Sequence, residues 1–291
     1  MSVTRNRVIA VTTAVILASS LASSMDEARA ARRPVSVVTL NELPKPAPPP
    51  APEPTPEPVP ADPATDDPAP APEPEPRPPA PAPAQPVDGG QGLLRTVAGP
   101  HVRDGRGVIS LTFDDGPSPT LTPMVLDILA RYDVRATFFV LGSQAEAHPD
   151  MVRAIVAAGH EVAGHTWSHR ALPGMDDRTF AAEVDVAVDL LEQLTGAPIA
   201  CVRPPFGMFD DESVQRLAGR GLRTAMWTHD TRDWDRPGTD AIVAAATADL
   251  GPGSVILLHD AGGDRSQTLA ALPRIIEHAL AAGLTFAPMC S

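Results

Sequence analysis

Lysine is nearly absent from this chain. Of its 23 basic residues only Lys45 is a lysine, and the formal net charge is −13. An acidic chain without lysine clusters lacks the basic surface that nucleic acids require, which argues against nucleic acid as a partner. Long hydrophobic runs are missing as well. The uncharged apolar run from Val8 to Leu21 is short for a membrane span, which takes about 20 residues, and no other stretch could cross a bilayer.

Cysteine is also scarce, with only Cys201 and Cys290 in the whole sequence. In an exported protein two cysteines permit a single disulfide. Cys201 lies in an expected strand beside a candidate site motif, whereas Cys290 lies near the end of the sequence. We therefore favour two unpaired thiols over a disulfide, although the sequence leaves the pairing open.

The first 31 residues have the pattern of a secretory signal. Arg5 and Arg7 precede the apolar run, and Ala28-Arg29-Ala30 follows it as a small-residue cleavage site. This pattern predicts export, to the medium or the cell wall. An uncleaved membrane anchor is the alternative, because acidic residues lie close to the expected cut. No cysteine lies close after the run, where lipid would be attached, which argues against a lipoprotein.

Residues 32–100 form a linker rich in proline, alanine and glutamate, with repeats such as Pro70-Ala71-Pro72-Glu73-Pro74. Such a composition cannot bury a core, and its prolines favour extended polyproline II at about 3.1 Å per residue. The linker is either a stiff spacer that carries the next domain away from a membrane or through a wall, or a passive disordered tail. From residue 101 to residue 291 the pattern predicts one globular domain, which we expect to be monomeric.

Within this domain short apolar runs alternate with longer amphipathic ones, which predicts parallel βα units. The expected fold class is α/β, a distorted (β/α) barrel of about seven parallel strands, because the domain is short for a full eight-stranded barrel of about 250 residues. An open doubly wound sheet is the alternative. The expected strands are Val108–Phe113, Ala136–Leu141, His160–Gly164, Ala200–Arg203, Thr224–Thr228, Ser254–Leu258 and Leu284–Ala287. The expected helices are Thr120–Arg131, Pro149–Ala158, Asp176–Leu194, Asp210–Ala218, Thr239–Leu250 and Gln267–Ala281.

Two adjacent carboxylates, Asp114 and Asp115, lie where the first strand meets its loop. Two carboxylates share a small site only when a cation or a proton lies between them. His165 and His169 follow the third strand, and an i, i+4 histidine pair can present two imidazoles on one side of a helical turn, the spacing that divalent metals use. Two imidazoles and one carboxylate are the ligand set of catalytic zinc and of open non-haem iron sites. The spare aspartate is then available as a base.

Polar motifs follow five of the expected strands at the same face of the domain, which is where active sites of parallel α/β folds lie. Independent scatter would rarely place all of them there. The motifs are Thr112-Phe113-Asp114-Asp115-Gly116-Pro117-Ser118, His165-Thr166-Trp167-Ser168-His169, Arg203-Pro204-Pro205-Phe206-Gly207, Asp230-Thr231-Arg232-Asp233-Trp234 and Leu257-Leu258-His259-Asp260.

These five motifs, in this order, resemble those of the polysaccharide deacetylases, the NodB-homology family of carbohydrate esterases. The resemblance covers roughly Val108 to Ala287 and leaves out the signal segment and the linker. It implies a distorted (β/α) barrel and metal-dependent hydrolysis of N-acetyl or O-acetyl groups on a polysaccharide.

The resemblance also implies a role for each site residue. Asp115, His165 and His169 would hold one divalent metal, with Zn²⁺ expected first and Co²⁺, Mn²⁺ or Ni²⁺ as alternatives. Asp114 would be the general base that activates water, and Arg203 would keep it ionised and oriented. Structural roles, a turn cap for Asp114 and an ion-pair strut for Arg203, are the alternatives.

His259 would be the general acid that protonates the departing amine. Asp233 would bond its imidazole and raise its pKa, with Asp230 as the rival for that position. The backbone N–H of Phe206, where relatives often carry tyrosine, would hold the oxyanion. Leu257 would line the pocket for the acetyl methyl group. Pro205 and Trp234 would contact the sugar, and Trp167 is a weaker candidate for stacking.

The expected function is an exported N-deacetylase acting on N-acetylglucosamine of peptidoglycan or of chitin-like chains. Peptidoglycan comes first because the signal and the spacer point to the cell wall. Two alternatives stay open: an acetyl xylan esterase that uses the same site, and a catalytically idle wall-binding module on a stalk. An intact set of base, acid and metal ligands argues against the idle module.

Overall fold

The central strand of the structure is β3 (Arg106–Asp114), whose residues from Val108 onward are all buried. The computed structural model describes residues 92–291. The expected signal segment, 1–31, and residues 32–91 of the expected linker lie outside the described residues. No helix in the described part of the chain is long and apolar enough to cross a membrane.

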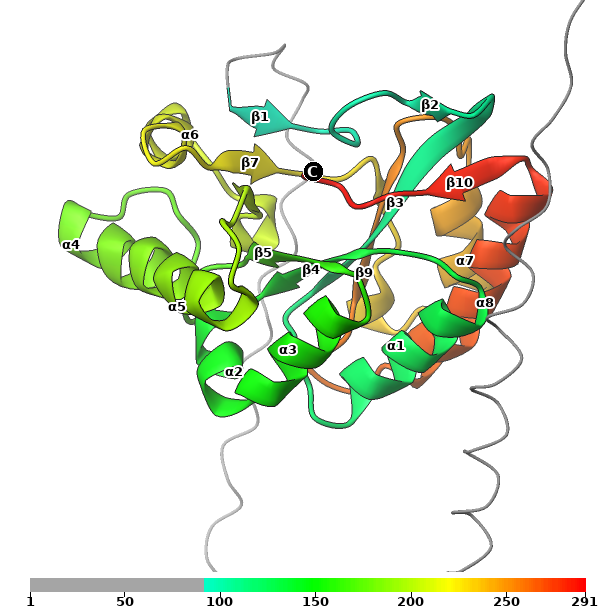
Figure 1. Cartoon of the computed structure of the whole chain (residues 1–291), viewed down its shortest axis with the longest axis horizontal. Coiled ribbons are helices and arrows are strands. Elements are labelled where there is room, and N and C mark those ends of the chain that lie inside the picture. The colour runs from blue at the N-terminus through cyan, green and yellow to red at the C-terminus, as the bar shows by residue number, and fades with distance from the viewer. Residues whose placement is uncertain (1–91) are drawn as a thin grey trace, which may run out of the picture. The chain divides into compact units, whose positions relative to one another are not determined.

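Each of the predicted strands is present, and together they form one curled parallel sheet (Figure 1). The sheet runs in the order β1-β7-β6-β5-β4-β3-β9-β8, and β10 pairs with the first half of β3 while β4 and β9 pair with its second half. Strands that follow one another around a sheet in this way make an incomplete barrel, without the reversal of order that defines a doubly wound sheet. The predicted fold class, a distorted barrel, is confirmed. The predicted strands are β3, β4 (Thr137–Val140), β5 (Glu161–Gly164), β6 (Cys201–Val202), β7 (Arg223–Ala225), β9 (Val255–His259) and β10 (Leu284–Phe286).

Three short strands were not predicted, because two residues carry no readable alternation. They are β1 (Leu93–Leu94), β2 (Val102–Arg103) and β8 (His229–Asp230). β1 pairs with β7, and Val97 just after it is buried. Residues 92–100, which the sequence assigned to the linker, therefore take part in the folded domain. The boundary predicted at residue 100 was placed too late.

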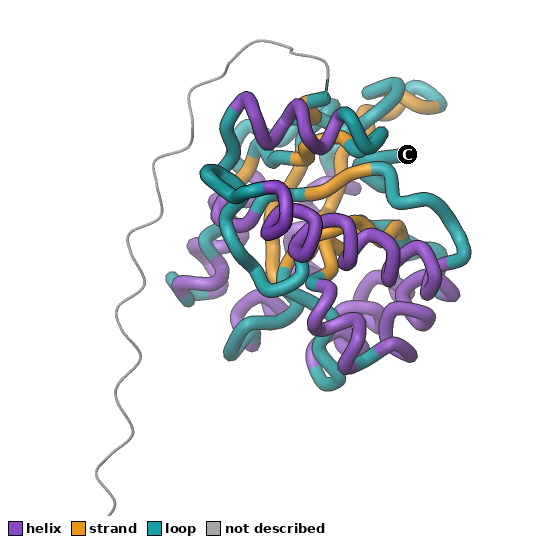
Figure 2. Tube along the Cα trace, turned by 90° about the vertical axis from the view of Figure 1, so that its left-hand side faces the viewer, coloured by secondary structure: helices purple, strands orange, loops and turns teal. Residues whose placement is uncertain are grey.

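The helices lie around the outside of the strands (Figure 2). The structure has α1 (Leu121–Arg131), α2 (Gly142–Ala147), α3 (Pro149–Ala157), α4 (Asp177–Phe180), α5 (Val186–Thr195), α6 (Asp211–Ala218), α7 (Thr239–Thr247) and α8 (Ser266–Ala281). The long helix predicted over 176–194 is divided, because a π-helical turn at Ala181–Asp185 separates α4 from α5. The short α2 was not predicted, since six residues are too few to show a helical period.

Alternation along β3 separates the core from the site. Ile109, Leu111 and Phe113 belong to the large apolar cluster under the helices. Thr112 and Asp114 have the opposite orientation, because successive side chains of a strand point to opposite faces. Both are buried on the inner face of the curled sheet, and Asp114 ends that row. The strand pattern that builds the core therefore also points a carboxylate into the barrel.

The structure joins Cys201 and Cys290 in a disulfide, so the expectation of two unpaired thiols was wrong. The last residues fold back across the inner face of the sheet after β10. There the N–H of Met289 donates to Thr137 Oγ1 at 2.8 Å, and the N–H of Cys290 donates to Glu161 Oε2 at 2.9 Å. These contacts bring Cys290 to the buried Cys201 on β6. The return path depends on tertiary contacts that no local pattern indicates.

Candidate active site

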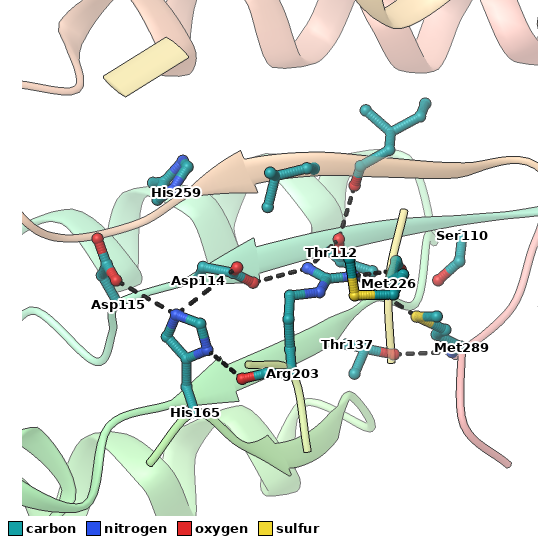
Figure 3. Close-up of polar contacts among 12 residues, drawn as sticks. Ser110, Thr112, Asp114, Asp115, Thr137, His165, Arg203, Met226, His259 and Met289 are labelled. Atoms are coloured by element: carbon teal, nitrogen blue, oxygen red, sulfur yellow. Dashed lines mark hydrogen bonds and ion pairs between the residues drawn. The ribbon is translucent and has the colours of Figure 1, made fainter. Parts of the chain in front are cut away.

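The chain turns sharply where β3 ends. Asp114 is the last strand residue and is 3% exposed, and Asp115 takes the left-handed conformation with φ 74°. This turn brings both carboxylates to one imidazole. Nε2 of His165 lies 3.8 Å from Asp114 Oδ2 and 3.6 Å from Asp115 Oδ1. Figure 3 shows the three side chains pointing toward one another.

His165 follows β5 and its tautomer is determined by its neighbour. Nδ1 donates a hydrogen bond of 2.7 Å to the carbonyl oxygen of Arg203, and a carbonyl can only accept. In the neutral ring the lone pair is then on Nε2, which faces the two aspartates. A histidine held this way is prepared to ligate a metal through Nε2.

His169 reaches the same place by a loop and not by a helix. Its Nε2 lies 3.2 Å from Asp115 Oδ1. The segment does not form the helical turn that the spacing of the two histidines would allow, because Thr166 and His169 both have φ of 64° and the residues between them have no helical structure. The two imidazoles still meet at Asp115, because the loop that joins the histidines starts at the end of β5 and is hydrogen-bonded to the start of α2. Gly142 and Ser143 donate their N–H groups to its carbonyl oxygens, those of Thr166 and Trp167.

Asp115, His165 and His169 fit a divalent cation. Each offers one ligand atom, and these atoms all lie within 4.8 Å of one another. Oδ1 of Asp115 is buried and accepts no hydrogen bond within the described residues, although buried carboxylate oxygens normally have a partner. Burial raises the pKa of Asp115, but the surrounding imidazoles, when protonated, outweigh it and hold that pKa well below its usual range. Two imidazoles and a carboxylate are a donor set suited to zinc.

Arg203 fixes the orientation of Asp114. The guanidinium is fully buried, and Nη1 donates to Asp114 Oδ1 at 2.7 Å and to Thr112 Oγ1 at 2.8 Å. Nη2 donates to the carbonyl oxygen of Met226, and the ring of Phe139 packs 3.9 Å from the guanidinium carbon. Burial lowers the pKa of Arg203 and the Asp114 carboxylate opposes that shift. With Oδ1 held by Arg203, Oδ2 of Asp114 faces the histidine (Figure 3).

His259 ends β9 directly beside Asp114, because the two residues are partners in the register of β3 and β9. Its Nδ1 donates to Asp233 Oδ1 at 2.7 Å, and its backbone N–H donates to Asp233 Oδ2 at 2.9 Å. Burial lowers the pKa of His259, but the charge and hydrogen bond of Asp233 outweigh it and raise that pKa to about 9. Asp230 instead accepts the N–H of Arg232 on the surface. The structure thus places Asp233, and not its rival, on the imidazole.

The remaining predicted residues have varied positions. Phe206 has φ 59°, is 44% exposed, and its ring packs edge-on against that of His169 with centroids 4.5 Å apart. Pro205 and Leu257 are buried. Trp234 is half-buried with its ring under the guanidinium of Arg232. Trp167 packs so closely on Gly142 of α2 that a Cβ there would collide with its ring, which favours a packing role for this tryptophan.

Asp260 and Glu183 are buried carboxylates near the site to which the sequence analysis assigned no role. Asp260 accepts a 2.5 Å hydrogen bond from Thr122, and its N–H donates to the carbonyl oxygen of Asp114. Burial raises its pKa to about 7, with the nearby charges of Asp115 and Asp114 adding to the effect. Its position directly after His259 was the available signal. Glu183 lies on the π-helical turn, and only its place on a buried helix face could have indicated it.

Comparison with known proteins agrees with this geometry. The family model described as polysaccharide deacetylase matches residues 101–225. A chitooligosaccharide deacetylase of Sinorhizobium fredii is 44% identical over 200 residues, which cover 63% of this chain and 89% of the relative. A peptidoglycan-N-acetylglucosamine deacetylase of Bacillus cereus is 36% identical over 62% of this chain and 84% of the relative. The crystal structure of the Bc1960 peptidoglycan N-acetylglucosamine deacetylase superposes with a TM-score of 0.60 at 33% identity, over 62% of this chain and 85% of that one.

The fold and the site therefore define a hydrolase of N-acetyl amide bonds. The chain belongs to the polysaccharide deacetylase family, as its five motifs predicted.

Proposed function

We propose that this chain is an exported, zinc-dependent deacetylase that removes the N-acetyl group from N-acetylglucosamine residues of peptidoglycan. The observation that carries the proposal is the pair Asp114 and His259, side by side on β3 and β9 next to the three metal-ligand candidates. One is a carboxylate held by a buried arginine, and the other is an imidazole held by a buried aspartate. Amide hydrolysis needs such a base and such an acid together.

Asp115, His165 and His169 would hold the cation. A divalent cation there would polarise the acetyl carbonyl and lower the pKa of a water molecule toward neutrality. Zinc suits this donor set and is the cation we expect first, with Co²⁺, Mn²⁺ and Ni²⁺ as the alternatives. The ligand atoms lie within 4.8 Å of one another, which supports one ion shared by all three residues.

Asp114 would accept a proton from the water that adds to the acetyl carbonyl carbon. Its Oδ1 is held by Arg203, so Oδ2 is the atom available to take the proton. The same hydrogen bond fixes the orientation of this carboxylate. The backbone N–H of Phe206 would donate to the carbonyl oxygen as negative charge develops there.

His259 would supply the proton that allows the amine to leave. When the carbon–nitrogen bond breaks, the electron pair goes to nitrogen and the proton of His259 goes with it, which leaves acetate and a free amine. Nδ1 is bonded to Asp233, so Nε2 is the ring atom that would donate. A pKa of about 9 supports a protonated ring at neutral pH.

Substrate contacts would come from residues at the rim of this site. We assign the acetyl methyl group to a pocket lined by Leu257, and the sugar to Pro205 and Trp234. The relatives act on two polymers, since one is a chitooligosaccharide deacetylase and another a peptidoglycan-N-acetylglucosamine deacetylase. The signal pattern of residues 1–31 and the proline-rich spacer favour the cell-wall polymer for this chain.

The test is acetate release from peptidoglycan, chitooligosaccharides and acetylated xylan in parallel, after chelation and re-addition of single metals. We expect release from peptidoglycan, loss on chelation, and recovery with Zn²⁺. Faster acetate release from acetylated xylan than from the other polymers would show that the function is O-deacetylation and not N-deacetylation. Absence of release from every polymer with metal bound would favour an idle wall-binding module.

A further inference from the structure

Glu183 is a buried carboxylate that the catalytic roles above do not use. It lies in the π-helical turn Ala181–Asp185, between α4 and α5, and is 8% exposed. Its Oε2 accepts the backbone N–H groups of Trp167 at 3.1 Å and of Ser168 at 2.9 Å, and its Oε1 accepts the Ser168 hydroxyl at 2.6 Å. One side chain thus takes three hydrogen bonds from two consecutive residues.

Those two residues lie between the metal-ligand candidates His165 and His169. The segment turns through left-handed conformations at Thr166 and His169, which non-glycine residues adopt only when their surroundings hold them there. Two consecutive N–H groups that point to one side need an acceptor, and no helix or strand supplies one here. Glu183 supplies it.

The loop is held from two directions. The N–H groups of Gly142 and Ser143, at the start of α2, donate to the carbonyl oxygens of Thr166 and Trp167 at 2.9 and 3.0 Å. Glu183 takes the amide groups of the same loop from the side of α4 and α5. The π-helical turn matters because it widens the helix by one residue, and such turns are frequent at functional sites. In this case the widened turn carries Glu183 while its neighbour Val184 stays in the apolar core.

We propose that Glu183 is a positioning residue that holds the loop from His165 to His169 in the conformation that brings both imidazoles to Asp115, and that it thereby sets the affinity for the metal. The inference rests on the metal site of the proposed function. Groups that orient metal ligands from outside typically contribute about 10- to 100-fold in affinity. Glu183 would act in this way through the backbone of the loop.

The test is the Zn²⁺ affinity of the full chain, measured without substrate by competition with a chromophoric chelator. Glu183→Gln keeps the size of the side chain but replaces one acceptor oxygen with an NH₂ group that cannot accept an N–H. We expect its affinity to fall by about 10- to 100-fold. Because the ligands themselves are intact, excess Zn²⁺ should restore most of the deacetylase activity, which a general loss of folding would not allow.

Glu192→Gln is the matched control. Glu192 lies on α5, is half-buried, and accepts the backbone N–H of Ile199 at 3.1 Å. The substitution removes the same charge and disturbs the same kind of bond, but it leaves the histidine loop untouched. We expect its Zn²⁺ affinity to equal that of the wild type.

A second variant keeps the test decisive if Glu183→Gln fails to fold. Ser168→Ala removes only the hydroxyl bond to Oε1, and we expect a smaller loss of Zn²⁺ affinity in the same direction. Wild-type affinity in a folded Glu183→Gln, or in Ser168→Ala where the first variant does not fold, would overturn the proposal. A wild-type chain that binds no divalent cation would overturn the proposed function as well, so the two failures are distinguishable.

Discussion

Replacing Asp233 with asparagine tests the assignment of the general acid. The carboxylate is 1% exposed. It accepts the backbone N–H and the Nδ1–H of His259 and the hydroxyl of Thr268. Asparagine has the same shape and can still accept the Nδ1–H of the imidazole through its oxygen. It removes the negative charge that stabilises the imidazolium. The substitution therefore lowers the proton affinity of His259, and it also loses the bond from the backbone N–H of His259, because the NH₂ group that replaces Oδ2 cannot accept.

The size of the effect follows from the pKa of His259. Burial lowers that pKa and Asp233 raises it, with a net result of about 9 against an ordinary value of 6.5. Without the Asp233 charge, burial acts against the weaker pull of Asp115 and Asp114, and we expect a pKa of about 6.5 or lower. At about pH 7.5 the protonated fraction of His259 would then fall from about 97% to about 10%. The rate of amide hydrolysis at that pH should fall about tenfold or more, and should recover toward pH 6.

The assay is kcat/KM for acetate release from an N-acetylglucosamine oligomer as a function of pH. In Asp233→Asn the alkaline limb of this pH profile should move to lower pH by about 2 pH units or more. In Asp230→Asn, the matched control, the limb should stay in place, since the exposed Asp230 carboxylate accepts the N–H of Arg232 and the structure places Asp233 on the imidazole. Hydrolysis of para-nitrophenyl acetate, whose leaving group needs no proton, should be much less sensitive to Asp233→Asn. An unshifted alkaline limb in Asp233→Asn would refute the assignment of His259 as the acid.

Three further predictions concern stability. Arg203→Met leaves the buried Asp114 without its partner and should lower the free energy of unfolding by about 3–5 kcal/mol in urea titrations, with loss of acetate release. A loss of less than about 1 kcal/mol would contradict the presence of a buried ion pair. Removing the disulfide in Cys201→Ser/Cys290→Ser frees a loop of 89 residues in the unfolded chain and should lower the free energy of unfolding by about 4 to 5 kcal/mol. An unchanged urea midpoint would contradict the presence of the disulfide. Burial lowers the pKa of His160 to about 4, so as the pH falls the unfolded chain takes up a proton before the folded one does. The contribution of neutral His160 to the free energy of unfolding should therefore be fully present above about pH 6.5 and decrease as the pH falls toward 4. His160→Asn can still accept the N–H of Ala136 and should show less of this decline, and equal pH dependence in both proteins would exclude His160 as its source.

The strands and the order of the site motifs were predictable because both follow from local pattern. Ile109, Leu111 and Phe113 alternate with inward-facing residues, so the strand, its buried face and the position of Asp114 at its end are all present in one short stretch. Parallel βα alternation then brings the strand ends to one face. The sequence predicted the convergence of Asp114, Asp115, His165, His169 and His259 for this reason.

The features that were missed depend on contacts between distant segments. β1 forms only because Leu93 and Leu94 pair with β7, and the disulfide forms only because the last residues return across the sheet. The spacing of His165 and His169 alone cannot show that they lie on a loop in which Thr166 and His169 adopt left-handed conformations. Glu183 supports that loop from a helix whose π-helical turn has no readable signature in the sequence.

The central claim is that Asp115, His165 and His169 together hold one divalent cation that deacetylation requires. The most direct test is the metal content of the purified full chain after dialysis against Zn²⁺, measured beside acetate release, for the wild type and for His169→Ala. We predict about one equivalent of zinc and zinc-dependent acetate release in the wild type, and loss of both in the variant. Acetate release that persists in a wild-type chain stripped of all metal, or zinc bound equally well by His169→Ala, would contradict the claim.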